Sequence, residues 1–287
     1  MSLAFEPVAT CQGEAAGLIW REDLVLFCAV DESRILSFNP SSGAVGEFRR
    51  YTSRTSALSD GPDGHLYGAQ SGSRRIVRFN ADGSTTPLLS RLRGRIHNHP
   101  RDLTIDSSAR IWFSDPHSPI PAPGPQVHGR LEHASVLRLR PLANRSLVLE
   151  RMTSDTTNPA AVQIAPDSSR LYVTDNDPSP SGRRELRSYP IAEDGSLGSP
   201  IVLHTFGADA RGPHRGGSGM CLGAAGELYL CAGSIEAGPG PMIYVFSAEG
   251  QLVTTNSLPE TPVSCCIAPG SIYVTTLGGR LLRASLV

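Results

Sequence analysis

The stretch DSSARIWFSD at residues 106–115 joins a polar turn to an apolar, aromatic run, and the chain repeats this pattern. Further copies are GPDGHLYGA (61–69), APDSSRLYVTD (165–175), GAAGELYLCA (223–232), APGSIYVTT (268–276) and, more loosely, REDLVLFCA (21–29). Consecutive copies lie roughly 40 to 60 residues apart, an interval typical of repeat architectures. Valine, isoleucine and aromatic residues between Gly, Pro, Asp and Ser indicate short antiparallel strands joined by tight turns.

Each copy is followed by further strand-like runs, for example RRIVRFNADG (74–83) and TTPLLS (85–90). Four-stranded units at this interval are typical of a β-propeller, and six copies predict six blades. We therefore predict an all-β fold in which residues 1–287 form a single six-bladed β-propeller domain. The last unit offers only three evident strands, so we expect AFEPVAT (4–10) to pair with it as the outer strand and close the ring.

Charge and hydropathy exclude several classes of partner. The formal net charge of −1 gives no electrostatic reason to expect nucleic acid or an acidic membrane surface. No run approaches the roughly 18 apolar residues of a membrane span, and MSLAFEPVAT does not resemble a signal peptide. We expect a cytoplasmic monomer whose partner is a small molecule. The six cysteines contain no C-x-x-C pair, so we expect free thiols.

Three polar insertions interrupt the regular spacing of the repeats. They are HSPIPAPGPQVHGRLEH (117–133), NDPSPSGRREL (176–186) and FGADARGPHRGGSG (206–219). Long loops on a rigid scaffold are preferred places for binding and catalytic residues, so we expect these segments to surround a functional face.

The local motifs resemble those of one known family. The stretches are LRGRIHNHPRDLTIDSSARIWFSDP (92–116), IAPDSSRLYVTD (164–175) and GSGMCLGAAGELYLCA (217–232), and they are similar to the SMP-30/gluconolactonase family of six-bladed propellers. The resemblance implies a hydrolase of lactones or esters with one calcium-like cation over the central channel. Such an ion would polarise the substrate carbonyl and activate a water molecule.

The resemblance also implies four ligand positions, which the family fills with Glu, Asn, Asn and Asp. In this chain they fall on Ala16, Arg101, Ala160 and Ser218. Two of these side chains have no donor oxygen and one is a permanent cation, so we expect no metal and no other cofactor. We expect the Arg101 guanidinium to stand in for the cation, by polarising a carbonyl or binding a carboxylate.

The candidate catalytic residues are Arg101, Asp102 and His99, with Asp102 expected to orient Arg101. The candidate substrate-binding residues are His97, Glu14, Asn158, Asp175, His214, Arg215 and Ser218.

Three alternative sites remain open at this stage. Glu14 and Asn158 lie two residues before the family ligand positions and could hold a relocated cation. His97 and His99 could bind a transition metal together with His214 or Asp175. Ser218 and His214 could form a nucleophile and its base.

The sequence therefore predicts a propeller that acts on a small carbonyl- or carboxylate-bearing metabolite in its central channel without a metal. The alternatives are a metal-independent cyclase of natural-product biosynthesis, a non-catalytic binder of small molecules, and a metal-dependent lactonase with relocated ligands.

Overall fold

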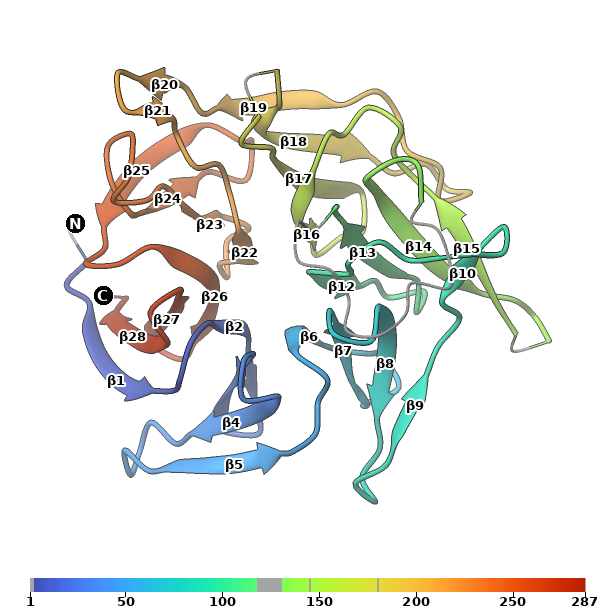
Figure 1. The fold of residues 1–287 in the computed structure, drawn as a ribbon, viewed down its shortest axis with the longest axis horizontal. Helices are drawn as coiled ribbons and strands as arrows, with labels where there is room; N and C mark the ends of the chain where they lie inside the picture. Colours follow the sequence, from blue (N-terminus) through green and yellow to red (C-terminus); the bar gives the residue numbers. More distant parts are fainter. Residues whose placement is uncertain (1–2, 118–130, 145, 180, 287) are drawn as a thin grey trace.

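The computed structural model describes residues 3–117, 131–144, 146–179 and 181–286. Six four-stranded antiparallel sheets surround a central axis as the blades of a propeller (Figure 1). This confirms the predicted fold. The described residues contain no helix, and accordingly no helix in that part of the chain has the length and apolarity that a membrane crossing requires.

The first three blades follow one another along the chain, each running from its inner to its outer strand. Blade 1 contains β2 (Ala15–Arg21), β3 (Leu24–Ala29), β4 (Arg34–Phe38) and β5 (Val45–Arg49). Blade 2 contains β6 (Thr55–Asp60), β7 (Leu66–Gln70), β8 (Arg75–Phe79) and β9 (Thr85–Pro87). Blade 3 contains β12 (Leu103–Ile105), β13 (Ile111–Asp115), β14 (Ser135–Pro141) and β15 (Leu147–Arg151).

Blades 4 and 5 repeat this order, and blade 6 takes its outer strand from the start of the chain. Blade 4 contains β16 (Pro159–Ile164), β17 (Arg170–Asn176), β18 (Arg184–Pro190) and β19 (Ile201–Thr205). Blade 5 contains β22 (Gly219–Leu222), β23 (Leu228–Ala232), β24 (Met242–Phe246) and β25 (Leu252–Ser257). Blade 6 contains β26 (Pro262–Ala268), β27 (Ser271–Thr276), β28 (Arg280–Ser285) and β1 (Glu6–Thr10).

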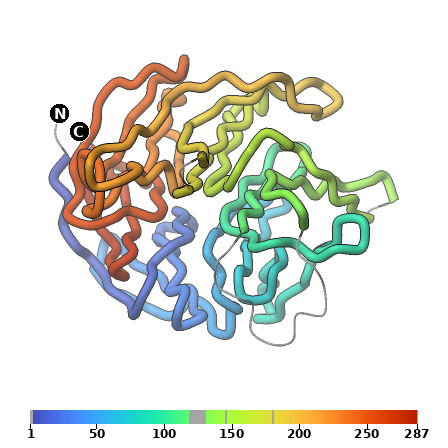
Figure 2. The backbone as a smooth tube through the Cα atoms, turned by 45° about the horizontal axis from the view of Figure 1, so that its top comes forward, coloured from blue at the N-terminus to red at the C-terminus, as the bar shows by residue number. Residues whose placement is uncertain are grey.

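The pairing of β1 with β28 closes the ring, as the three-stranded last repeat predicted. Glu6 pairs with Arg283 and Thr10 with Arg280 in an antiparallel register. Figure 2 shows the two chain ends side by side at this blade. Closure covers the edge that β28 would otherwise expose.

The recurring polar turn has a direct physical explanation in blade 3. Asp106 accepts hydrogen bonds from the backbone N–H groups of Ser108 and Arg110, both at 3.0 Å. Its other carboxylate oxygen accepts the Nε1–H of Trp112 at 2.8 Å. A single aspartate thus closes the turn and fixes the aromatic residue that follows it. Asp167 closes the equivalent turn of blade 4 through the backbone of Ser169.

The hydrophobic core is divided into six clusters, and each one fills the boundary between two neighbouring blades. One cluster joins Phe27 of blade 1 to Tyr273 of blade 6, for example, and another joins Phe113 of blade 3 to Ile76 of blade 2. Among the described residues, no sheet extends from one blade into the next. Adjacent blades are therefore held together mainly by the removal of this apolar surface from water.

Because the strands alternate in direction, the loops that enter the inner strands lie on the same face as the loops between second and third strands. We call this the mouth face. Two small hairpins, β10–β11 (Arg91–Leu92 with Arg95–Ile96) and β20–β21 (Ala208–Asp209 with Gly212–Pro213), lie in loops that lead to β12 and β22. The predicted insertion 176–186 extends the β17–β18 hairpin. Most of the insertion 117–133 lies outside the described residues.

Candidate functional site

The loop that leads into β12 is held by a buried aspartate. Asp115, the last residue of β13, accepts the backbone N–H groups of Asn98 and His99, each at 2.8 Å. The side chain is fully buried, and burial raises its pKa to about 7 against the opposing effect of these two hydrogen bonds. Asp115 therefore fixes the backbone just before Arg101.

Asp175 does the same in blade 4. It accepts the backbone N–H groups of Thr157 and Asn158, at 2.7 and 2.6 Å, and burial raises its pKa. The structure thus places Asp175, predicted to bind substrate, behind the loop that enters β16. Sequence reasoning missed Asp115, although both residues close copies of the same repeat, IWFSD and LYVTD.

Arg101 lies on the mouth face, in the loop that enters β12. Its backbone N–H donates to the Ser114 carbonyl at 3.1 Å, and its carbonyl accepts the hydroxyl of Ser56 at 2.8 Å. Across the described ranges, no ion pair or hydrogen bond involves its guanidinium. The backbone of Arg101 is therefore fixed, while its charged group can act on a ligand.

A second guanidinium, that of Arg215, lies close enough for the two charges to interact. Burial and the positive charge of Arg101 together lower the pKa of Arg215 to about 10. Glu14 acts in the opposite direction, so its carboxylate also lies within range of Arg215. The backbone N–H of Glu14 donates to Asp31 at 2.9 Å. Of the residues placed here, none forms an ion pair with the side chains of Arg215 or Glu14.

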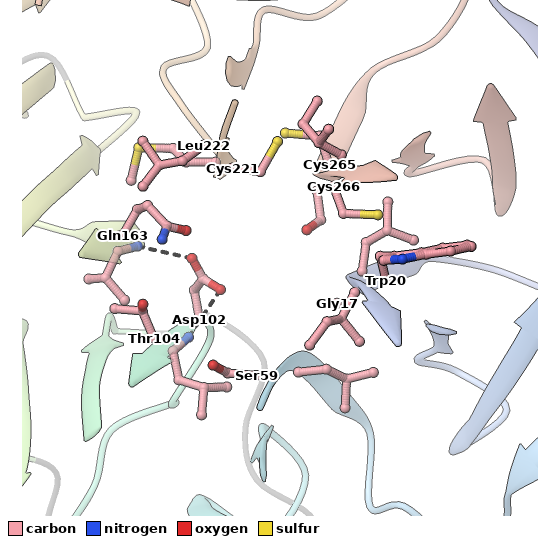
Figure 3. Close-up of a pocket in the computed structure, with 18 residues that line it drawn as sticks. Gly17, Trp20, Ser59, Asp102, Thr104, Gln163, Cys221, Leu222, Cys265 and Cys266 are labelled. Atoms are coloured by element: carbon pink, nitrogen blue, oxygen red, sulfur yellow. Dashed lines mark hydrogen bonds between the residues drawn. The ribbon is translucent and has the colours of Figure 1, made fainter. Parts of the chain in front are cut away.

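Asp102 has a different position from the one expected for a partner of Arg101. Its two carboxylate oxygens accept the backbone N–H groups of Leu103 at 3.0 Å and Val162 at 2.9 Å, which ties β12 to β16 (Figure 3). Burial raises the pKa of Asp102 to about 7, and the nearby charge of Arg101 opposes this rise. The carboxyl group lines the channel below Arg101.

The channel contains a cavity of roughly 310 Å3, lined by residues from the inner strands of all six blades (Figure 3). Polar groups on its wall include Ser59, Asp102, Thr104 and Gln163, and Trp20 contributes an aromatic ring. In each blade that carries a family ligand position, the residues that line the cavity follow that position along the chain. Because the inner strands run away from the mouth face, the cavity lies farther from that face than the ligand positions. We call it the lower cavity.

The residues at the four family ligand positions do not fit a cation. Ala16 and Ala160 are buried and carry no donor oxygen. The hydroxyl of Ser218 donates to the Pro262 carbonyl at 3.0 Å, and Arg101 is itself a cation. Among the residues that the structure describes, no group of three or more His, Cys, Asp or Glu side chains could hold a metal ion.

The alternative sites are not assembled by the described residues. The side-chain oxygen of Asn158 accepts the backbone N–H of His117 at 3.1 Å, which occupies one of its two lone pairs. His214 lies 3.7 Å from the carboxylate of Asp209, and the hydroxyl of Ser218 donates to backbone carbonyls. No hydrogen bond joins Ser218 to His214 within the described ranges.

The two histidines of RIHNHPRD have different environments. His97 is completely buried, and its ring lies 5.0 Å from that of Phe113. It therefore has no exposed surface from which to contact a ligand in the channel. His99 is half-buried and lies two residues before Arg101, on the mouth face.

The six closed blades place the chain in the class of six-bladed β-propellers. The sequence profile of the SMP-30/gluconolactonase/LRE-like region matches residues 13–278, and the chain belongs to this family. It is 26% identical over 228 residues to a gluconolactonase of Zymomonas mobilis, which covers 77% of this chain. The chain spans only 59% of the length of that relative.

Solved structures agree with this assignment. A gluconolactonase from Xanthomonas campestris superimposes with a TM-score of 0.80 at 25% identity, covering 99% of this chain and 90% of its own. A calcium-binding regucalcin from Agrobacterium tumefaciens has a TM-score of 0.72 at 14% identity, covering 98% and 93%. At that identity the second likeness concerns the fold alone.

Proposed function

We propose that this protein is a metal-independent hydrolase of small lactones or related esters, with its site at the channel mouth. The observation that carries the proposal is the group formed by Arg101, Arg215 and Glu14. In the described structure, neither guanidinium group has a carboxylate partner, and the carboxylate of Glu14 is also without an ion pair. The guanidinium groups suit the carbonyl oxygen of a substrate, and the carboxylate suits a water molecule. Family membership and the similarity to gluconolactonases support the substrate class.

In the proposed reaction, the guanidinium N–H groups of Arg101 and Arg215 bind the carbonyl oxygen and stabilise the negative charge that develops on it. Glu14 accepts a proton from a water molecule as that water attacks the carbonyl carbon. The tetrahedral intermediate then loses the ring oxygen, which takes the proton back from Glu14. The product is a hydroxy acid, whose carboxylate the two guanidinium groups can also bind.

A lactone screen on chelator-treated protein tests this proposal. We expect turnover that survives the chelator, because no step uses a metal. Glu14→Gln should lower kcat/KM by about 100-fold or more, the usual contribution of a general base. Arg101→Ala should lower it by about 100- to 1000-fold, as for loss of an oxyanion donor. Glu22→Gln and Arg170→Ala, at turns on the opposite face, serve as matched controls.

The outcomes separate the proposal from its alternatives. A requirement for an added divalent cation would contradict metal independence. Binding of lactones without turnover would show a non-catalytic binder. Normal activity in Glu14→Gln would remove the proposed base. Conversion of a lactone to an isomer without uptake of water would favour a cyclase-type enzyme.

A further inference from the structure

Three cysteine thiols meet beside the lower cavity, at the boundary between blades 5 and 6. Cys265 lies on the inner strand β26, Cys221 on the inner strand β22, and Cys231 on the adjacent strand β23. The side chains of Cys221 and Cys231 both lie close enough to that of Cys265 to shift its pKa, and the Cys265 thiol donates a hydrogen bond to the Tyr229 carbonyl at 3.5 Å. Figure 3 shows the sulfur atoms of Cys221 and Cys265 directed toward each other, whereas that of Cys266 points away.

This cluster is in contact with the channel. Cys221 and Cys265 both line the lower cavity, and so does Asp102. The charge of Cys265 raises the pKa of Asp102, so the two side chains lie near each other on the wall of the lower cavity. A cavity of roughly 310 Å3 is about ten times the volume of a water molecule and admits a small polar reagent.

We propose that Cys265 and Cys221 form a peroxide-reactive thiol pair, which hydrogen peroxide oxidises to a disulfide that links the inner strands of blades 5 and 6. In the first step, the Cys265 thiolate attacks one oxygen of the peroxide and the O–O bond breaks. The departing hydroxide takes up a proton, which leaves a sulfenic acid on Cys265 and one water molecule.

In the second step, the sulfur of Cys221 attacks the sulfenic sulfur of Cys265. The S–S bond forms, the S–O bond breaks, and the hydroxyl leaves as a second water molecule with the proton of Cys221. Two thiols are thereby oxidised, and one peroxide is reduced to two waters. None of these residues takes part in the proposed lactone hydrolysis.

The electrostatics of the cluster agree with Cys265 as the attacking group. Interaction with the side chains of Cys221 and Cys231 lowers the pKa of Cys265, although burial opposes this. The pKa of Cys221 is raised, first by its interaction with Cys265 and then by burial. Because burial raises the pKa of Asp102 to about 7, that carboxyl group can hold a proton near neutral pH and give it to the departing hydroxide.

A redox role fits the arrangement better than a metal site. The part of the chain that the structure describes contains no group of three or more Cys, His, Asp or Glu side chains that could hold a metal ion. The structure has all six cysteines as free thiols, which is the form that the reaction consumes.

The test uses the reduced full-length protein, treated with one equivalent of hydrogen peroxide. Titration of thiols after denaturation should fall from six to four, and the mass should decrease by about 2 Da as two hydrogens are lost. Peptide mapping without reductant should identify a Cys221–Cys265 link. Dithiothreitol should restore six thiols.

Single variants assign the two roles. Cys221→Ser should stop at the sulfenic acid, which dimedone labels on Cys265. Cys266→Ser is the matched control, because Cys266 lines the same cavity with its sulfur directed away, and it should behave as the wild type. Cys265→Ser should lose no thiols at this amount of peroxide.

Because a serine at position 265 can disturb a buried cluster, peptide mapping of the wild-type protein decides the matter without that variant. A link between any other two cysteines would overturn the proposal. So would the absence of a link under conditions that oxidise glutathione. Neither result bears on lactone turnover, so this proposal and the proposed function fail independently.

Discussion

Mild acid should destabilise this protein through His97, and the variant His97→Leu should escape that effect. The imidazole is completely buried, and neither ring nitrogen has a hydrogen-bond partner among the described residues. Burial and, to a smaller extent, the charge of Arg74 together lower the pKa of His97 from 6.5 to about 3. The unfolded chain takes up a proton near the ordinary pKa, whereas the folded chain does not. Stability is therefore lost as the pH falls below about 6.5.

The magnitude follows from the size of this shift. A difference of about 3.5 pKa units corresponds to about 5 kcal/mol once the pH lies below both values. Between pH 7 and pH 5 the expected loss is about 2 kcal/mol, a large share of a typical stability of about 5 to 15 kcal/mol.

Two buried carboxyl groups act in the opposite direction over the same range. Burial raises the pKa of Asp102 and of Asp115 to about 7, so the folded state binds protons that the unfolded state releases. Their contribution makes the protein more stable as the pH falls toward the ordinary pKa of aspartate, and less stable as it rises. The pH dependence of the wild-type protein alone therefore cannot isolate His97, but the difference between wild type and variant can.

The assay is urea unfolding of wild type and His97→Leu at pH 7, 6 and 5. The packing change caused by leucine is independent of pH, so only the titration of His97 changes the difference in unfolding free energy. We expect this difference to move by about 2 kcal/mol in favour of the variant between pH 7 and pH 5. A difference that stays constant would show that His97 titrates alike in both states. His65→Leu, with a side chain that is 41% exposed, is the control.

Further predictions concern packing, closure and metal content. Trp112→Phe removes the 2.8 Å hydrogen bond to Asp106 and should lower the unfolding free energy by about 1 to 3 kcal/mol, measured by urea denaturation. Gly219→Ala would place a Cβ atom 2.4 Å from the Val263 carbonyl oxygen and should lower Tm, whereas Gly198→Ala meets only ordinary contacts from 3.5 Å and should not. Deletion of β1 should lower Tm and promote aggregation, since it exposes the edge of β28. Elemental analysis of protein purified without chelator should find no stoichiometric divalent ion, and one ion per chain would contradict the account.

The architecture could be predicted because its physical cause is local and repeated. Each polar turn needs an aspartate or glycine at a fixed place, as Asp106 shows, and each following strand needs a buried aromatic or branched residue, as Trp112 does. The count of repeats then implied the closing role of β1. These are short-range rules, so one sequence was sufficient to apply them.

The site was less predictable because it depends on which loops meet across the channel. The family motif placed Arg101 at the mouth, but its charge interaction with Arg215 joins residues more than one blade apart. The burial of His97 had no sequence signal, since its loop is not a regular strand. The Nε–H of Arg74 donates to the carbonyls of His97 and Asn98, at 2.7 and 2.9 Å, and holds this segment in the interior.

The central claim is that a guanidinium at the channel mouth acts where the family resemblance implies a cation. Calorimetric titration of chelator-treated protein with gluconate, a hydroxy acid of the expected product class, tests it most directly. The account predicts binding by the wild type in the presence of the chelator. It also predicts at least about tenfold weaker binding by both Arg101→Ala and Arg101→Lys with Tm nearly unchanged, because an ammonium lacks the planar fork of donors. Binding that requires added calcium would contradict it, as would an Arg101→Ala variant that binds gluconate normally but melts at a much lower temperature.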